Sequence, residues 1–460
     1  MQKIYVNPKT SCGNVIMSEA IKGGTMKALI FDGSYQGDPH SDQIRSSFQE
    51  HLPGAESVIL RQQRIGNCAG DFLCWVRSPG VCMTDDANRQ LASRIVDSDL
   101  LIYLTPVTFG GYASPLKCMV DHQIQNSLPY FNANNKELHH QPRYQRYPNL
   151  LVVGWMDAPD AQSEAIFRHL VRRNALNTFT PKAYAGIVVG EPSPSQVSEQ
   201  IPQWFAALER QENLPSPALP RMPAPQAGDP VRRAVLLVGS PRLYKSTSAS
   251  LGGYLMRQME SRGVQTETIL VYPQFSSKER AESALQKLDS ADLVILAFPL
   301  YVDSLPGALT AALELIAEHR SKANAILQSE QRFAAMANCG YPEAAHNLTA
   351  LAICAQFSQQ AGFRWAGGLS LGGGEGLIHG VPLENLRGSN LLIKKSLDLT
   401  AAALTGGDPV PAAAVGLLAK SIVPSWLYRL IGHYRWKRQA KTYGVQENLS
   451  ARPYESLALK

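Results

Sequence analysis

The sequence predicts two α/β domains, each with three layers in which helices cover both faces of a parallel five-stranded sheet. Three observations support this prediction. The chain has 460 residues, and a domain typically has about 100–200. A proline-rich stretch at residues 211–230 divides it, with six prolines in twenty positions. Apolar runs and helical patterns follow one another in the same order on both sides of this stretch.

The apolar runs read as strands that are buried on both faces. They occupy residues 27–33, 99–106, 150–156 and 183–189 in the first half, and 234–240, 292–299, 332–338 and 363–371 in the second. Continuous aliphatic runs of about 5–8 residues that alternate with helical patterns are typical of parallel sheets, because helices then cover both faces. Right-handed crossovers place those helices on the two sides of the sheet.

The proline-rich stretch favours extended backbone and reads as a semi-rigid linker. We therefore expect an N-terminal extension at 1–25, a first domain at 26–210, the linker at 211–231, a second domain at 232–408 and a basic helical tail at 409–460.

Composition excludes several classes of protein. Hydrophobic residues make up 45% of the chain, which excludes wholesale disorder, and no stretch of 18 uncharged apolar residues predicts a membrane span. Seven scattered cysteines favour a reducing, cytoplasmic setting. The net charge of +6 lies in the tail, so we expect no nucleic-acid partner. Between Asp408 and Glu447 the chain has no acidic residue and six basic ones: Lys420, Arg429, Arg435, Lys437, Arg438 and Lys441.

The loop after the first strand of the second half has residue types that suit an anion. Ser240 and Arg242 are followed by the Ser246, Thr247 and Ser248 hydroxyls at the start of a helix. A helix N-terminus has unpaired N–H groups and positive dipole character, and an arginine can pair with a phosphate. Serine and threonine also cap helices that bind nothing, so an ordinary capped helix is the simpler interpretation of this loop alone.

The loop after the third strand places an aromatic residue among apolar ones: Pro299, Leu300, Tyr301 and Val302. Such a loop can lie along a flat ring while its backbone N–H groups reach the ring's heteroatoms. In an open parallel sheet the loops after strands one and three converge at the carboxyl edge, where ligands bind.

On these loops the second half, roughly residues 233–400, resembles the NAD(P)H-dependent flavin reductase branch of the flavodoxin-like superfamily. The matching stretches are GSPRLYKSTS (239–248), FPLYVDSLP (298–306), NCGYPEAAHN (338–347) and WAGGLSLGGGEG (365–376). The first half resembles the related iron–sulfur flavoproteins and flavin reductases at residues 32–42, 67–86 and 105–122. The resemblance implies bound FMN, with the nicotinamide of NAD(P)H stacked directly on its ring.

In the first half the resemblance assigns the phosphate to Ser34 and Ser41, and the ring to Thr105, Pro106, Val107, Phe109 and Gly110. The ring loop matches well. The phosphate loop contains Asp38 and Asp42 and no lysine or arginine, which makes a phosphate there unfavourable unless both carboxylates point away. The ring loop favours the first half as the FMN site and the phosphate loop favours the second, so the occupied half stays open.

A cysteine-rich insertion distinguishes the first half: Ser34 to Pro106 is 72 residues, against 59 from Ser240 to Pro299. Iron–sulfur flavoproteins hold a cluster with C-x2-C-x2-C-x7-C, and here the positions are Cys68, Asp71, Cys74 and Cys82. A carboxylate is a poor cluster ligand, and Cys12 or Cys118 would have to complete the set. We expect no metal, and a loop that lies over the flavin site or at a subunit contact.

Taken together, the motifs predict an FMN-dependent NAD(P)H oxidoreductase that passes hydride to a quinone, a free flavin or another small acceptor. No catalytic side chain is expected, because the flavin supplies the chemistry. One alternative is an iron–sulfur electron-transfer protein, and another is a non-catalytic interaction protein. Related reductases place the flavin at a dimer contact, so we expect a homodimer or an intrachain pseudo-dimer.

Two other segments receive interpretations. His139 and His140 lie in a long polar stretch, residues 127–148, and are expected at the surface. Residues 423–444 interleave aromatic and basic residues at helical spacing. That segment fits an anionic membrane surface or the cofactor phosphates, and packing on the second domain is the favoured interpretation.

Overall fold

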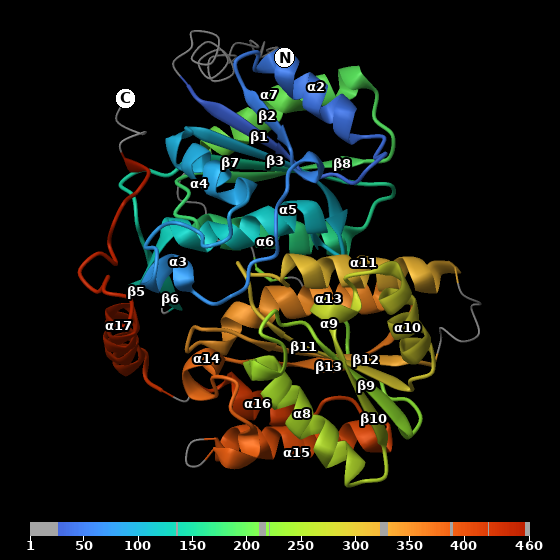
Figure 1. Cartoon of the computed structure of the whole chain (residues 1–460). Helices are drawn as coiled ribbons and strands as arrows, with labels where there is room; N and C mark the ends of the chain where they lie inside the picture. The colour runs from blue at the N-terminus through green and yellow to red at the C-terminus, as the bar shows by residue number, and fades with distance from the viewer. Residues whose placement is uncertain are drawn as a thin grey trace, which may run out of the picture.

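The computed structural model describes residues 26–134, 137–210, 218–219, 221–322, 330–386, 390–421 and 423–455. The expected extension at 1–25, with Cys12, lies outside the described residues, as does part of the linker. Two α/β units stand one above the other (Figure 1).

The first unit is built on a parallel sheet in the order β2-β1-β3-β7-β8, with β4 antiparallel to the end of β3. The strands are β1 (Ala28–Asp32), β2 (Glu56–Ile59), β3 (Leu100–Thr108), β4 (Gly111–Tyr112), β7 (Asn149–Met156) and β8 (Ala183–Val189). The helices are α2 (Ser41–His51), α3 (Leu73–Val76), α4 (Ala87–Asp97), α5 (Ser114–Asp121), α6 (Ala161–Asn177) and α7 (Pro194–Arg210), with short 3-10 turns η1 (Leu60–Gln62) and η2 (His122–Asn126).

The second unit has the parallel order β10-β9-β11-β12-β13. Its strands are β9 (Arg233–Val238), β10 (Gln265–Leu270), β11 (Leu293–Pro299), β12 (Arg332–Asn338) and β13 (Arg364–Leu371). Its helices are α8 (Thr247–Glu260), α9 (Val271–Gln274), α10 (Lys278–Asp289), α11 (Gly307–Lys322), α13 (Leu348–Gln360), α14 (Gly374–Leu377) and α15 (Leu391–Gly406), with turns η3 (Leu243–Lys245), η4 (Ala344–Asn347) and η5 (Leu383–Asn385).

Each main sheet therefore has the strand order 2-1-3-4-5 of the flavodoxin-like fold, which confirms the predicted fold class. The four apolar runs predicted in the first half correspond to β1, β3, β7 and β8, and those of the second half to β9, β11, β12 and β13. The edge strands β2 and β10 were not among the predicted runs. Two features differ from the expectation: β4 extends the first sheet, and β5 (Ser127–Asn134) pairs with β6 (Glu137–Pro142) in a separate antiparallel hairpin.

The expectation that His139 and His140 lie at the surface is wrong, because His139 is buried and His140 half-buried in strand β6 of this hairpin. The His139 side chain is 5% exposed, and burial lowers the pKa of His140 to about 3. Phe131 stacks on the His140 ring and the tilted ring of Tyr341 also contacts it, so aromatic residues from both units cover His140.

Equivalent helices of the two units face each other. Helix α5 follows the third strand of its unit and contacts α11, which follows the third strand of the other; α6 and α13 after the fourth strands pair in the same way. One hydrophobic core joins the units, and the rings of Phe109 and Phe357 meet edge to face across it. Contact between equivalent surfaces is the pattern of a two-fold dimer, here within one chain.

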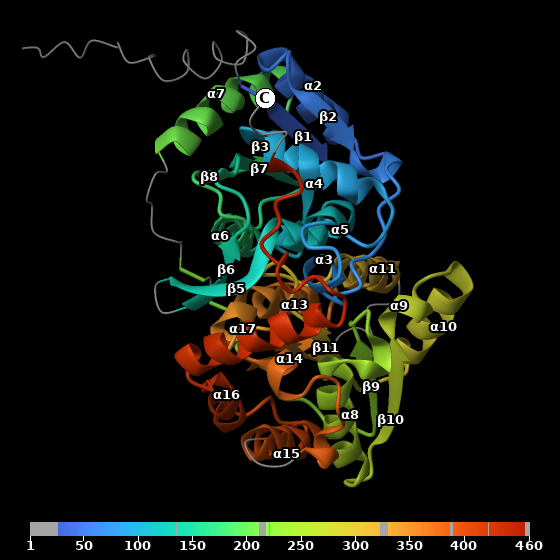
Figure 2. The same ribbon diagram turned by 60° about the vertical axis from the view of Figure 1, so that its left-hand side comes forward.

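The segments outside the two sheets tie the chain together. Beyond residue 221 the linker runs along the second unit, where the Gln226 and Gly228 amides donate to the Trp365 and Gly407 carbonyls. The tail forms α16 (Ala412–Ala419) and α17 (Ser425–Lys441). Helix α17 was expected to pack on the second unit. It contacts the loops of that unit, where Tyr428 donates to the Gly340 carbonyl at 2.6 Å and Arg435 to the Gly376 carbonyl at 3.2 Å, and it also contacts α3 and β5 of the first. Figures 1 and 2 show it beside the junction of the two units.

Candidate functional site

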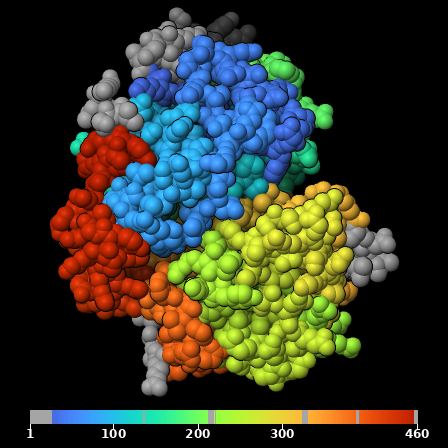
Figure 3. Space-filling view, in the orientation of Figure 1, coloured from blue at the N-terminus to red at the C-terminus, as the bar shows by residue number. Residues whose placement is uncertain are grey.

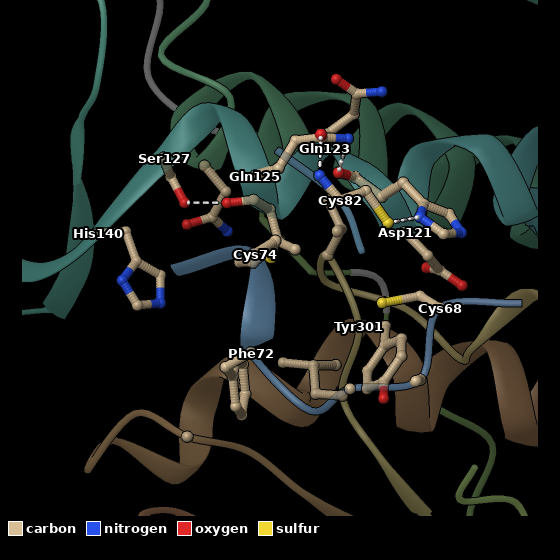
Figure 4. A pocket seen from close by; sticks show the side chains of 18 of the residues that line it. Cys68, Phe72, Cys74, Cys82, Asp121, Gln123, Gln125, Ser127, His140 and Tyr301 are labelled. Atoms are coloured by element: carbon tan, nitrogen blue, oxygen red, sulfur yellow. Dashed lines mark hydrogen bonds between the residues drawn. The ribbon is translucent and has the colours of Figure 1, made fainter. Parts of the chain in front are cut away.

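A cavity of about 170 Å³ lies between the units at the carboxyl edge of the second sheet. The second unit contributes Leu300–Asp303 after β11 and Cys339–Tyr341 after β12. The first unit covers these loops with residues from 68–84 and η2. Figure 4 shows Tyr301, Phe72 and the cysteines of this loop around one space. The cysteine-rich insertion thus lies over the predicted ring loop of the other half.

The ring loop makes a tight turn with unusual backbone angles. The Tyr301 and Ser304 backbones hydrogen-bond to each other, and the residues between them, Val302 and Asp303, have φ of 44° and 59°. Two adjacent non-glycine residues in the left-handed region store strain of order 1–3 kcal/mol each, so surrounding contacts must hold the turn.

Helix α6 of the first unit supplies those contacts. The Asn174 amide donates to the Val302 carbonyl at 3.0 Å and the Asn177 amide donates to the Asp303 carboxylate at 2.7 Å. Arg173 pairs with the same carboxylate at 3.4 Å. Asp303 is 2% exposed. The first unit therefore holds the strained turn of the second.

The Arg173 guanidinium joins this turn to the hairpin. It donates to Glu137 at 2.6 Å and lies 2.9 Å from the Nδ1 atom of His346. The hydrogen bond from His139 and the interaction with Arg173 lower the pKa of Glu137 to about 2, against the opposing effect of burial. The cluster is thus a charged network shared by both units.

A second anchor lies on α5. The Lys117 ammonium pairs with Asp121 and donates to the Tyr301 carbonyl at 2.9 Å, while Asp121 accepts from the Gly307 amide at 2.7 Å. Lys117 and Asp121 are almost fully buried. A buried ion pair of the first unit therefore fixes both the start of the ring loop and the first turn of α11.

The predicted phosphate loop of the second unit is covered by its own chain. Ser240, Ser246, Thr247 and Ser248 are all at most 3% exposed. Ser246 caps α8, accepting from the Ala249 amide; Ser248 accepts from Asn338 at 2.9 Å; and Thr247 donates to the Gly374 carbonyl at 3.3 Å. The short helix α14 thus lies on the first turn of α8.

Arg242 points in another direction, into a second cavity of about 400 Å³. It donates to Glu375 at 2.6 Å, and His379 also reaches that carboxylate. The two cavities adjoin, because both are lined by Gly70, Asp71, Phe72, His140 and Gly340. Arg435 of α17 lines the second cavity as well, and the carboxylates of Asp71 and Glu375 face the same space. GGGEG (372–376), expected as a flexible loop beside the site, includes part of the short helix α14 and lines this space.

The corresponding loop of the first unit is filled by a carboxylate. Asp38 accepts from the His40 and Ser41 amides, at 2.9 and 3.2 Å, and from the Trp155 indole at 3.1 Å. Ser34 is buried and donates to Asp32 at 2.5 Å. The Asp38 carboxylate occupies the start of α2, where an anion would otherwise bind.

The predicted ring loop of the first unit is part of the interface core. Phe109 is 7% exposed and packs on Phe357. Thr105 accepts from the Ala113 amide at 3.1 Å, and a side chain at Gly110 would collide with Ile166. Pro106 and Val107 are half-buried at the end of β3. The structure thus separates these residues from the cavity that Leu300, Tyr301 and Val302 line.

The three cysteines of the insertion line the first cavity together with Asp71. Burial raises the pKa of Cys68 to about 12 and that of Cys74 above its usual value. Burial also raises the pKa of Cys82, but hydrogen bonds to His122 and Thr84 outweigh it and leave that pKa lowered. Among the described residues no group of three or more His, Cys, Asp or Glu side chains could hold a metal ion.

The ring loop of the second unit is open to a flavin ring, whereas its serine-rich phosphate loop is covered. Among the described residues, the Val302 and Asp303 amides donate to no acceptor, so they are free to meet a ring heteroatom beside the cavity. Arg242, which pairs with Glu375, lies at the adjoining space. Residues 68–84 and α17 complete these walls. The excess length of the insertion indicated a covering role, and contact with the cofactor phosphates was one of the interpretations of residues 423–444.

The fold is that of a flavodoxin-like α/β protein, and the predicted ring loop of its second unit lines the first cavity. Residues 232–346, a quarter of the chain, match the family described as NADPH-dependent FMN reductase. The match confirms the resemblance read from the second-half motifs. The resemblance of the first half to iron–sulfur flavoproteins stays a prediction. A comparison with curated proteins finds no match to this chain.

Several solved structures are similar to parts of the chain. An FMN-dependent NADH-azoreductase from Bacillus anthracis has 14% identity over 38% of this chain and 99% of its own, with a TM-score of 0.29. A putative quinone reductase from Klebsiella pneumoniae has 15% identity, 39% and 87% coverage and a TM-score of 0.28. The Trp repressor binding protein from Bacillus subtilis has 12% identity, 30% and 84% coverage and a TM-score of 0.25. At these TM-scores no function is transferred from them to this chain.

Proposed function

We propose that this chain is an FMN-dependent NAD(P)H oxidoreductase with one flavin site, in the second unit. The observation that carries the proposal is the cavity lined by Leu300, Tyr301 and Val302, which continues to Arg242. The family match over residues 232–346 supports it. The first unit is proposed to hold no flavin, because Asp38 fills its helix start and Phe109 its interface.

In this proposal the chain's own residues bind, orient and exclude water. Leu300–Val302 would lie along the flavin ring, and Arg242 would exchange Glu375 for the phosphate. The loop at 68–84 closes the cavity from the first unit, and burial keeps the Tyr301 hydroxyl protonated by raising its pKa. A bound FMN would accept hydride from a nicotinamide and pass it to a small acceptor such as a quinone or a free flavin.

The test is an FMN titration of the purified chain, followed by its visible spectrum and flavin stoichiometry. We expect one FMN per chain and steady NADPH or NADH oxidation on addition of a quinone. Arg242→Ala should weaken FMN binding by about tenfold or more, because a charge-assisted pair is worth about 1.5–3 kcal/mol. Lys245→Ala, in the same loop but exposed, is the matched control and should change little. A colourless chain that takes up no FMN would leave a non-catalytic interaction protein.

A second candidate function is an iron–sulfur electron-transfer protein. It is favoured by one observation: Cys68, Cys74 and Cys82 line the same cavity as the ring loop, with Asp71 at the position of the missing cysteine. The described residues offer no site for a single metal ion, but a cluster of several irons spaces its ligands more widely than a single ion does. Iron and acid-labile sulfide in protein purified without oxygen would support this candidate, and their absence with quinone-dependent NAD(P)H oxidation would exclude it.

A further inference from the structure

Helix α17 packs on the body of the protein through one face and leaves the opposite face exposed. Tyr428, Gly432, Trp436 and Ala440, four residues apart in turn, form the inner face. Trp436 packs on Phe72 and Trp75 of the first unit, and Gly432 lies against Phe131. These contacts fix the helix on the body of the protein, so the side chains on its opposite face cannot turn inward.

The outer face is exposed and carries apolar side chains among basic ones. Trp426, Leu430 and Tyr434 recur at the same spacing and are 64%, 61% and 66% exposed. Ile431 beside them is 44% exposed. Burying such side chains is worth about 1.5–3 kcal/mol each, so their exposure on one stripe of a helix marks an interaction surface.

Positive charge surrounds this stripe without neutralisation. Arg429, Lys437, Arg438 and Lys441 are exposed, and none of the ion pairs among the described residues involves them. No acidic residue lies between Asp408 and Glu447. Figure 3 shows this C-terminal segment in red at the edge of the molecule, alongside both units. A partner of this face must therefore be apolar in its interior and negatively charged at its surface.

We propose that the outer face of α17 docks the protein on an anionic lipid bilayer surface. A basic helix with an aromatic and aliphatic stripe lies in the interfacial plane, with its apolar side chains among the acyl chains and its lysines and arginines at the headgroups. No helix of the described residues is long and apolar enough to cross a membrane, so the contact is peripheral. This surface association differs from the favoured sequence interpretation, in which the helix only packs.

Docking has a consequence that rests on the proposed function. Ile431, Arg435 and Gln439 of α17 also line the second cavity, so the bilayer would lie beside that cavity. An acceptor dissolved in lipid, such as a quinone with a long hydrocarbon tail, would then be nearer the site than one dissolved in water.

The experiment measures flotation of the full chain with phosphatidylcholine vesicles that contain or lack phosphatidylglycerol. We expect binding to the anionic vesicles, little to neutral ones, and weakening with salt. The triple variant Trp426→Ser, Leu430→Ser, Tyr434→Ser and the double variant Lys437→Glu, Arg438→Glu should each weaken binding by about tenfold or more.

The matched controls make the same kinds of substitution at exposed leucines and exposed basic residues outside α17. Leu391→Ser, Leu392→Ser, Leu399→Ser changes three exposed leucines of α15, which are 70%, 40% and 37% exposed. Arg262→Glu, Lys278→Glu reverses two other exposed charges. Both should bind vesicles as the parent does, and an unchanged unfolding temperature shows that each variant is folded.

Three outcomes would overturn the proposal: no flotation with anionic vesicles, equal loss in the controls, or a concentration-dependent dimer that the triple variant disperses. Preferential binding to mixed-sequence duplex DNA would overturn it as well. Because flotation requires no flavin, its result is independent of the proposed function. For the acceptor, the triple variant should lose reduction of a vesicle-bound quinone and retain that of a water-soluble one; failure with both would instead count against the oxidoreductase.

Discussion

At the scale of single residues, the loop at 68–84 contains a glycine, Gly70, that lies too close to Tyr301 to be replaced by a larger residue. Gly70 has φ of 60°, and a Cβ built there would lie 1.8 Å from the Tyr301 hydroxyl oxygen. Tyr301 belongs to the other unit and is half-buried. No side chain larger than hydrogen therefore fits unless the Tyr301 side chain moves.

We predict that Gly70→Ala destabilises the chain by about 2–4 kcal/mol, from the left-handed backbone together with overpacking against Tyr301. Urea unfolding measures the change. Gly37→Ala is the matched control, because its φ is 77° with nothing within 4 Å of the new Cβ. It should cost only about 1 kcal/mol. Equal losses in the two variants would show that the contact with Tyr301 is unimportant.

Asp38 shows how much of the first unit's phosphate loop could be predicted from the sequence. Asp38 makes a phosphate in the first half unfavourable by charge alone, unless it points away. In the structure it points inward and accepts two backbone amides and the Trp155 indole. Trp155 is 117 positions away in the chain, so this part of the network had no local signal in the sequence.

At the scale of elements, helix α6 acts as a support for the ring loop of the opposite unit. Three of its side chains reach the turn at Val302 and Asp303. The apolar positions of α6 are those of an ordinary amphipathic helix, which packs on its own sheet and on α13. Its buried Asn174 finds a partner across the interface, and its buried Arg173 pairs both with Asp303 across the interface and with Glu137 of the hairpin.

We predict that Arg173→Met destabilises the chain by about 3 kcal/mol or more, because it leaves Asp303 and Glu137 without their common cation. Adding Asp303→Asn should recover part of the loss, and a double-mutant cycle in urea gives the coupling energy. Arg168→Met, on the same helix with a partly exposed partner, should cost about 1 kcal/mol or less. Simple additivity of the two substitutions would contradict the direct pairing.

The elements differ in how well the sequence predicts them, for a physical reason. A central parallel strand is buried on both faces, so it must be an apolar run such as 234–240 or 292–299. The edge strands β2 and β10 are partly exposed and read ESVI and QTETIL, which lack that run. Hairpin β5–β6 is polar in sequence because its cover comes from distant segments, among them α17.

At the scale of the whole molecule, the two units share a core, so neither is an independent folding unit in the usual sense. Phe109 and Phe357 lie in one hydrophobic cluster with residues of both sheets. Buried charges cross the same interface at Lys117 and Arg173. Separation would expose apolar area and leave these charges unpaired at once.

We therefore predict a single cooperative thermal transition for the full chain. Scanning calorimetry should give one peak whose calorimetric and van't Hoff enthalpies agree. The physical reason is that unfolding of either unit removes the partner surface of the other. Two resolved peaks, or an enthalpy ratio near two, would contradict the shared core.

The sequence by itself determined the repeat, the parallel sheets and the loops at their carboxyl edges, because burial on both faces and turn chemistry are local and periodic. It also located the excess positive charge in the tail. Only the tertiary structure decided that Asp38 fills one helix start, that the insertion covers the other unit's ring loop, and that α17 keeps an apolar stripe outside. Those facts depend on contacts between segments far apart in the chain, and no local pattern encodes them.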